Sequence, residues 1–268
     1  MKRFLFFLLF IFLLIPTPLF ASVSIIGSLT REFIVLPGDK LEGGIILKNN
    51  KDKPVEVSIY QVDYLFYADG RNIYGKPGSN PRSNANWITI SPKRLMVPPK
   101  ATSTVSFKIQ VPKESNLKGT YWSMIMVEPI GEVRIENIED ESGKIKIGIH
   151  TVIRYGIQII TNISDTGEKK VKILNRRLIR SSNNTYIFQL DLENIGERGL
   201  QPKVILELYS KKGGFVGKFE ADKRIIYPGT SVRYELNLKG IEKGEYKALM
   251  IIDNGDKIWG AQYNLKID

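Results

Sequence analysis

The main pattern along the chain after residue 21 is an alternation of apolar and polar side chains with a period of two. In residues 105–111, 186–193 and 232–239, apolar side chains occupy every second position and the positions between them are mostly polar. Successive side chains of a β-strand point to opposite faces, so each segment predicts a strand with one buried and one solvated face. No window shows the period of 3.6 residues that an amphipathic helix needs. The pattern predicts an all-β protein.

An internal repeat predicts how these strands are grouped. In the first half, Val-Pro-Pro at residues 97–99 precedes an alternating strand, and Lys-Gly-Thr-Tyr at 118–121 opens an apolar one. In the second half, Tyr-Pro-Gly at 227–229 and Lys-Gly-Glu-Tyr at 243–246 stand in the same order. A third matching pair lies upstream, at residues 45–50 and 190–194. Two copies of one β-sandwich are the economical explanation.

The boundary between the two sandwiches is predicted at residues 162–168, where polar turn formers interrupt the apolar pattern. We therefore expect one sandwich over residues 22–163 and another over residues 164–268. The Gly-x-Tyr sequences that contain Tyr121 and Tyr246 resemble the tyrosine corner of immunoglobulin-like domains, in which the hydroxyl bonds back to the backbone. The predicted fold is two tandem immunoglobulin-like β-sandwich domains.

Residues 1–21 are predicted to be a cleavable signal peptide. Lys2 and Arg3 precede an apolar run over residues 4–15, and Pro16 and Pro18 follow it. The run is shorter than the roughly 18 residues that a membrane span needs. A retained anchor is the alternative. We expect an exported chain with no membrane span once the signal is removed.

Composition excludes much of enzyme chemistry. The sequence has no Cys and a single His, His150, which excludes thiolate nucleophiles, disulfides and multi-His zinc sites. We therefore predict that the protein is not an enzyme and holds no metal or cofactor. The net charge of +11 favours anionic partners, but the basic residues are scattered, and no nucleic-acid partner is predicted. The densest basic cluster, residues 169–180, is either a solvated strand face or an anion-binding patch.

Residues 64–86 form an insertion in the first half of the repeat. The segment is rich in Gly, Pro, Asn and Ser and displays the aromatic residues Tyr64, Phe66, Tyr67 and Tyr74. Long loops in compact domains are usually functional or mobile. Two interpretations remain open here: packing across the edge of the sandwich, or contact with a partner.

Residues 144–160 contain no Pro and carry an apolar or aromatic residue, or Thr151, at every second position from Ile145 to Ile159. At about 3.3 Å per residue, a strand of this length would span roughly 56 Å, far more than a strand of five or six residues. Such a strand is either buried in the core and linker or offers its edge to a partner strand.

With these features, the chain resembles the periplasmic chaperones of chaperone/usher pilus assembly over nearly all of the mature sequence. The resemblance implies that Arg31 on the first strand and Arg154 on the last strand of the first domain hold the carboxylate terminus of an exported subunit. It also implies that Ile145, Ile147 and Ile149 are the side chains of the donated strand. A guanidinium binds a carboxylate bidentately, and strand addition satisfies the backbone groups of a sheet edge.

The resemblance implies a periplasmic, chaperone-like protein that binds exported pilus or surface subunits by β-strand addition, with an outer-membrane usher as a further partner. One departure is the insertion at residues 64–86, which is longer than those chaperones usually carry. The segments at residues 87–92 and 118–121 also resemble segments of two-domain Gram-positive surface proteins that tether partners to peptidoglycan. The alternative function is therefore a cell-surface adaptor, and the expected location is periplasmic or extracellular.

Overall fold

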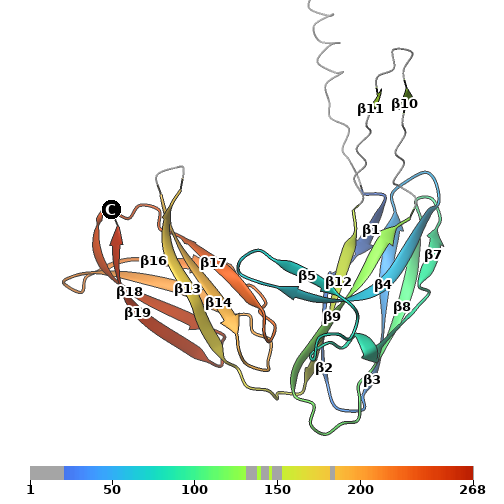
Figure 1. Ribbon diagram of the computed structural model, residues 1–268, viewed down its shortest axis with the longest axis horizontal. Helices are drawn as coiled ribbons and strands as arrows, with labels where there is room; N and C mark the ends of the chain where they lie inside the picture. The colour runs from blue at the N-terminus through green and yellow to red at the C-terminus, as the bar shows by residue number, and fades with distance from the viewer. Residues whose placement is uncertain (1–20, 131–137, 140–144, 147–152, 182–184, 268) are drawn as a thin grey trace, which may run out of the picture.

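The computed structural model describes residues 21–130, 138–139, 145–146, 153–181 and 185–267. Strands dominate this part of the chain, and its one helical element is the short 3-10 helix η1 (Ala85–Trp87) (Figure 1). The predicted all-β fold is confirmed. Residues 1–20 of the expected signal peptide lie outside the described residues. Within the described ranges, no helix has the length and apolar character needed to cross a membrane.

The first sandwich packs two sheets face to face. One sheet has the order β1-β3-β8-β6 and the other β2-β12-β9-β4-β5, with β7 also paired to β4. In β8 the side chains of Val105, Phe107 and Ile109 are buried and the residues between them are exposed, as the alternation predicts. The strands are β1 (Val23–Ile26), β2 (Thr30–Val35), β3 (Lys40–Asn49), β4 (Val55–Phe66), β5 (Asn72–Gly75), β6 (Ile88–Ser91), β7 (Arg94–Val97), β8 (Thr102–Gln110), β9 (Gly119–Pro129) and β12 (Tyr155–Ile163).

A separate pair of two-residue strands, β10 (Ile138–Glu139) and β11 (Ile145–Lys146), forms an antiparallel ladder between β9 and β12 in the chain. The side chains of Ile157, Ile159 and Ile163 in β12 belong to the core of the first sandwich. For β12, the burial interpretation of residues 144–160 therefore holds. Residues 147–152 lie outside the described residues, so one continuous strand over 144–160 stays a prediction.

The second sandwich packs the sheet β13-β14-β17 against the sheet β16-β15-β18-β19. Its core contains the inward side chains of β14, β15, β17 and β18. The strands are β13 (Val171–Arg180), β14 (Tyr186–Asn194), β15 (Lys203–Ser210), β16 (Phe215–Ala221), β17 (Ser231–Asn237), β18 (Gly244–Asp253) and β19 (Ile258–Ile267). The basic cluster at residues 169–180 falls largely on β13, where Lys172, Arg176 and Arg180 are exposed.

The repeat appears in the structure as one hydrogen-bond pattern made twice. Asn49 at the end of β3 and Asn194 at the end of β14 are both fully buried. Each side-chain amide donates to the carbonyl four residues later, at 2.8 Å and 2.7 Å. Each also donates across the sandwich, to the carbonyl of Val97 at 3.0 Å and of Ile226 at 2.9 Å. The matched Asn residues fix the same bend in both copies.

The two predicted tyrosine corners differ. The hydroxyl of Tyr246 donates to the carbonyl of Glu242 at 2.9 Å, which confirms the corner in the second sandwich. The ring of Tyr121 packs against Trp87 with centroids 4.7 Å apart, and the guanidinium of Arg82 lies 5.3 Å from its centroid.

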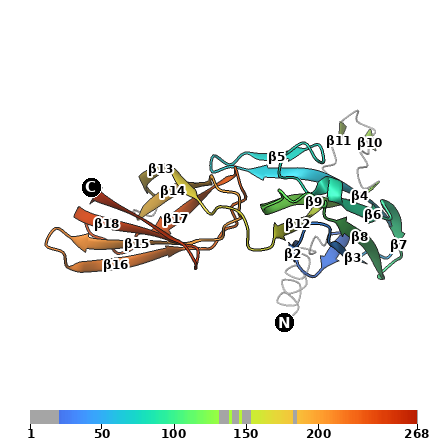
Figure 2. The ribbon, with the colours of Figure 1, turned by 90° about the horizontal axis from the view of Figure 1, so that it is seen from below.

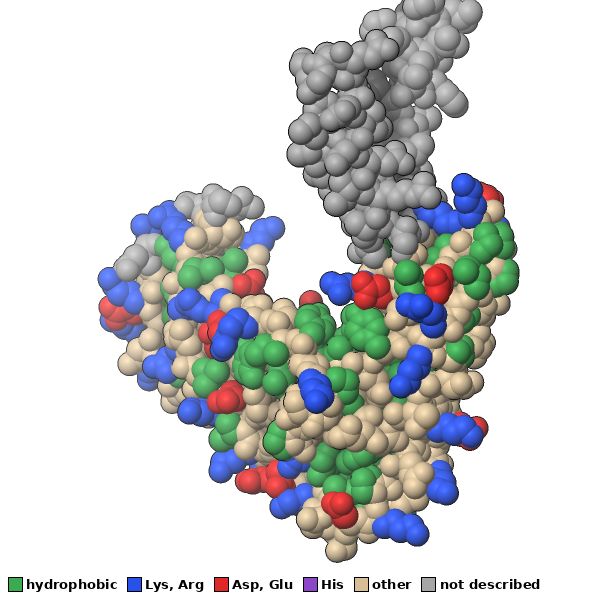
Figure 3. Space-filling model, turned by 45° about the vertical axis from the view of Figure 1, so that its right-hand side comes forward, with side chains coloured by type: hydrophobic (Ala, Val, Ile, Leu, Met, Phe, Trp, Pro, Cys, Tyr) green, Lys and Arg blue, Asp and Glu red, His purple; other side chains and the backbone are tan. Residues whose placement is uncertain are grey.

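The two sandwiches are joined through the segment between Ile163 and Val171 and enclose an angle (Figure 1). The hairpin of β4 and β5 extends from the first sandwich toward the strands β13, β14 and β17 of the second, as both ribbon views show (Figure 2). The hollow between the sandwiches is lined in part by hydrophobic side chains (Figure 3).

Candidate binding surfaces at the junction of the sandwiches

The insertion at residues 64–86 packs onto the second sandwich. Strand β4 runs on to Phe66 and turns back as β5, with Tyr64 opposite Tyr74. At the tip, the backbone N–H of Ala68 donates to the hydroxyl oxygen of Ser231 at 3.0 Å. Of the two interpretations of this segment, packing holds for the tip of the hairpin. The tip packs on the second sandwich, and not across the edge of the first sandwich as expected.

An aromatic cluster joins the sandwiches beneath this hairpin. The rings of Trp122 and Tyr227 stack with centroids 4.6 Å apart and planes 17° apart. The indole N–H of Trp122 donates to the carbonyl of Tyr64 at 2.7 Å, and the hydroxyl of Tyr227 donates to the amide oxygen of Gln158. Burial raises the pKa of Tyr227, so its hydroxyl stays protonated and remains a donor. These bonds leave no polar group of either aromatic side chain unsatisfied.

Direct backbone contact also fixes the junction. The N–H of Thr120 donates to the carbonyl of Glu197 at 2.9 Å, and the N–H of Gly199 donates to the hydroxyl of Thr120 at 2.7 Å. Gly119 has φ +75°, and a Cβ on it would lie 2.1 Å from the carbonyl oxygen of Glu197. Only glycine fits this close approach between the two sandwiches.

Strand β12 has one fully paired side and one partly open side. It pairs with β9 from Tyr155 to Ile163, but β2 covers its other side only from Gln158 onward. The backbone N–H of Gln158 donates to the carbonyl oxygen of Leu29 at 2.8 Å. Backbone groups alternate sides along a strand, so the N–H and C=O of Gly156 face the uncovered side. No described strand pairs with β12 there.

Arg31 lies beside this opening, on the inner face of its sheet. In the parallel pairing of β2 with β12, Arg31 is opposite Ile159 and Val35 is opposite Ile163, and both isoleucines are core residues. The Nε of Arg31 is buried and has no hydrogen-bond partner among the described residues. A buried donor without an acceptor is unfavourable, so the side chain is suited to bind an added acceptor.

Arg154 lies on the opposite face of the same sheet. Its Nη1 is 3.9 Å from a carboxylate oxygen of Glu128, and hydrogen bonding to Tyr60 with the charge of Glu128 raises the pKa of Arg154. Arg154 is five residues from Ile159, the register partner of Arg31, so the two Cα positions differ by roughly 16 Å along the strand. The structure does not bring the two guanidinium groups together, and a carboxylate held by both stays a prediction.

The predicted strand-donating residues fall at the margin of the described chain. Ile145 begins β11 and is opposite Glu139 of β10. Ile147 and Ile149 lie outside the described residues. Their insertion into a partner therefore stays a prediction.

A pocket of about 470 Å³ lies where the insertion meets the second sandwich. The hairpin of β4 and β5 contributes Tyr64 and Tyr67, and the second sandwich contributes Lys223, Arg224 and Arg233. Sequence reasoning did not identify these basic residues as a site. The one local signal is the adjacent pair Lys223-Arg224 just before Tyr227-Pro228. Among the described residues, no group of three His, Cys, Asp or Glu side chains could hold a metal ion.

No protein-family model matches the chain, and no curated protein matches its sequence. Several solved structures are similar to it. A chaperone–tip adhesin complex of CFA/I fimbriae gives 14% identity over 91% of this chain and 98% of that chain, with a TM-score of 0.47. The Pseudomonas aeruginosa CupB2 chaperone gives 10% identity over 91% and 100%, with a TM-score of 0.40.

A third similar structure is the CsuC–CsuE chaperone–tip adhesion subunit complex of Acinetobacter baumannii, at 11% identity over 90% of this chain and 98% of that chain, with a TM-score of 0.44. These structures belong to the kind of chaperone that the sequence resembles. TM-scores below 0.5 leave the function of this chain to be argued from its own geometry.

Proposed function

We propose that this protein is a chaperone-like binding protein for an exported protein subunit, and that it pairs the open edge of β12 with a strand of that subunit. The observation that carries the proposal is the uncovered side of β12 from Tyr155 to Ile157, next to the buried, unpartnered Nε of Arg31. An added strand satisfies edge backbone groups, and main-chain hydrogen bonds of this kind give affinity with little dependence on sequence.

The position of β2 supports pairing of an added strand with β12. β2 pairs in parallel with β12 from Gln158 to Ile163. A partner strand paired with Tyr155–Ile157 would therefore lie on the same side of β12 as β2, next to the start of β2. Ile153, just upstream, is 39% exposed, which offers an apolar side chain to the same partner. The sheet edge and the apolar residue together support binding of an extended segment.

Arg31 is the better candidate of the two predicted arginines for holding a carboxylate terminus. Arg31 forms no ion pair with a described residue, whereas Arg154 is already engaged with Glu128. A carboxylate that reached Arg31 would give its buried Nε the missing acceptor and would gain a charge-assisted hydrogen bond. The expected signal peptide at residues 1–21 supports binding in the periplasm or outside the cell.

The experiment compares Arg31→Ala, Arg154→Ala and the control Arg94→Ala in the tagged full chain. Arg94 is exposed on β7 and makes only a surface ion pair with Glu56 at 3.4 Å. The exported protein that co-purifies from the producing cells is isolated, and its affinity for each variant is measured. Loss of a desolvated charge partner costs roughly 2–5 kcal/mol, so Arg31→Ala should weaken binding at least about tenfold.

Arg154→Ala should have a smaller effect, and Arg94→Ala should leave the affinity unchanged. Equal affinities for the wild-type chain and Arg31→Ala would contradict the role of Arg31. Failure of any exported protein to remain bound to the wild-type chain would contradict the proposed function itself.

A further inference from the structure

The pocket between the insertion and the second sandwich has the size and construction of a small-molecule site. One wall is the hairpin that holds Tyr64 and Tyr67, and the other is the segment of residues 223–233. Its volume of about 470 Å³ falls within the roughly 300–1,000 Å³ typical of ligand pockets. Sites of this kind occur preferentially between domains, because two surfaces can enclose a ligand that neither could enclose alone.

The pocket is strongly cationic. Lys223, Arg224 and Arg233 line it, and no acidic side chain is among the described lining residues. Arg233 is neutralised by Asp191, with its Nε and Nη2 at 2.7 Å and 2.9 Å from the two carboxylate oxygens. Lys223 and Arg224 form no ion pair with a described residue. The walls therefore carry two positive charges that an anion would compensate.

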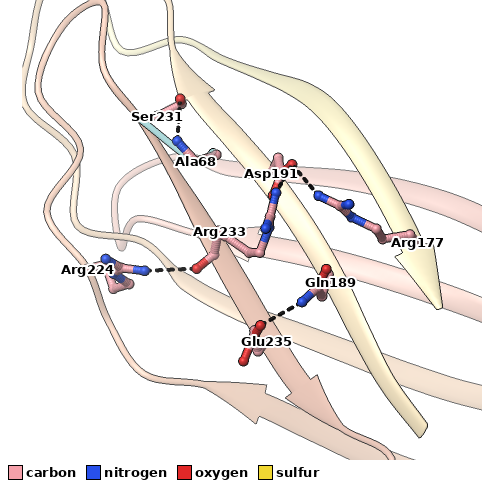
Figure 4. A network of polar contacts seen from close by, with 8 residues as sticks. All are labelled: Ala68, Arg177, Gln189, Asp191, Arg224, Ser231, Arg233 and Glu235. Carbon is pink, nitrogen blue, oxygen red and sulfur yellow. Dashed lines mark hydrogen bonds and ion pairs between the residues drawn. The ribbon is translucent and has the colours of Figure 1, made fainter. Parts of the chain in front are cut away.

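Local contacts hold the two arginines, Arg224 and Arg233, in place. The Nη1 of Arg224 donates to the carbonyl of Arg233 at 2.9 Å, which fixes the guanidinium while its other N–H groups stay available (Figure 4). Arg233 is in turn held by Asp191 on the neighbouring strand β14. The hydroxyl of Ser231 accepts from Ala68, so its own proton can be donated elsewhere. Donors that are already positioned lose little freedom when a ligand binds.

Uncharged groups complete the lining. The amide side chains of Gln158 and Gln201 and the aromatic side chains of Tyr64 and Tyr67 line the same space. The oxygen of Gln158 already accepts from Tyr227, so its NH2 group is the part that can donate to a ligand hydroxyl, and aromatic rings offer apolar surface to the carbon skeleton of a ligand. This combination fits a polyhydroxylated molecule with one anionic group better than it fits a bare inorganic ion.

We propose that this pocket binds a sugar-sized organic anion, with its carboxylate or phosphate group held by Lys223 and Arg224. The proposal does not rest on strand pairing at β12, because the residues proposed to hold the anion, Lys223 and Arg224, lie in the second sandwich and take no part in that pairing. A bound ligand would contact both sandwiches and would stabilise the junction described above.

The test is calorimetric titration of the chain from residue 22 to residue 268 with three probes: glucuronate, glucose 1-phosphate and glucose. Saturable binding of at least one anionic probe, with no binding of glucose at the same concentration, is the expected result. The stronger of the two anionic probes identifies carboxylate or phosphate as the preferred group. Binding of glucose as tightly as of the anions, or no saturable binding of either anion up to millimolar concentration, would overturn the proposal.

A pair of double variants locates the binding. Lys223→Ala with Arg224→Ala should weaken binding of the preferred anion roughly tenfold or more, because two charge-assisted contacts are lost. Lys212→Ala with Lys239→Ala removes the same charge from exposed positions elsewhere on the second sandwich and should leave affinity within about twofold. Equal losses in both double variants would show that net charge, and not this pocket, attracts the anion. Unchanged unfolding curves of both variants confirm that the fold is intact.

Discussion

Tyr227 of the second sandwich stacks on Trp122 of the first, and the same tyrosine donates its hydroxyl hydrogen to Gln158 of β12. One side chain thus connects the second sandwich to the strand whose edge is left open. Both rings are nearly fully buried, with Trp122 2% and Tyr227 1% exposed. The position of the second sandwich relative to β12 therefore depends in part on this buried aromatic contact.

Truncation of this contact should be costly. Tyr227→Ala removes a buried ring and should lower the free energy of unfolding by roughly 3–5 kcal/mol, whereas Tyr227→Phe removes only the hydroxyl and should cost about 1 kcal/mol. Urea denaturation measures both values. Phe215→Ala is the control, because that side chain is 62% exposed on β16 and should change stability little. A Tyr227→Ala protein as stable as the wild type would show that the stack contributes nothing.

Gly119 provides a test of the backbone contact between the sandwiches. Gly119→Ala forces a Cβ to within 2.1 Å of Glu197, so it should destabilise the protein and shift the two sandwiches apart. Gly229→Ala is a matched control, because Gly229 has the same φ of +75° but no atom within 4 Å of its added Cβ.

The control isolates the strain of the left-handed backbone, which both variants share. We expect Gly119→Ala to lower the unfolding midpoint further than Gly229→Ala and to increase the maximum dimension in small-angle X-ray scattering. Equal effects of the two substitutions would mean that the close approach at Glu197 is not needed.

Glu197 makes the junction sensitive to acid. A hydrogen bond from Lys118 at 2.9 Å, together with the backbone N–H of Glu168, lowers the pKa of Glu197. A carboxyl whose pKa is lower in the folded state contributes stability above its unfolded pKa, and that stability is lost as the pH falls through the folded value.

We therefore expect Glu197→Gln to lower the thermal midpoint near neutral pH and to lose less than the wild type as the pH falls below about 4. Glu114→Gln, at an exposed loop position, should follow the wild-type curve throughout. Parallel pH curves for the wild type and Glu197→Gln would rule out this contribution.

The fold could be predicted from local patterns because both copies carry them in the sequence. The alternation in β8 and β17 predicts strands, and the matched segments that contain Asn49 and Asn194 predict two copies of one sandwich. A buried Asn whose amide donates to several carbonyls can be recognised from one residue type at one position of the repeat. Recognising it does not require knowing which strands pair in the sheet.

The sites were less predictable because they depend on pairing between distant strands. Arg31 and Arg154 lie on opposite faces of the same sheet because of the register in which β2 pairs with β12. That register cannot be read from the sequence of either strand by itself. The basic pocket likewise forms only when the hairpin of β4 and β5 meets the segment around Arg224. The two segments are more than a hundred residues apart in the sequence, so their spacing does not indicate that they are in contact.

Amide hydrogen exchange at Gly156 reports whether a partner strand pairs with β12. In the free protein, Gln158 is protected by its bond to Leu29 at 2.8 Å, whereas the N–H of Gly156 faces no described strand. On binding of the co-purified exported subunit, exchange at Gly156 should slow at least about tenfold, while exchange at Gln158 should change little. A stable complex in which the exchange rate of Gly156 equals that of the free protein would contradict strand pairing at this edge.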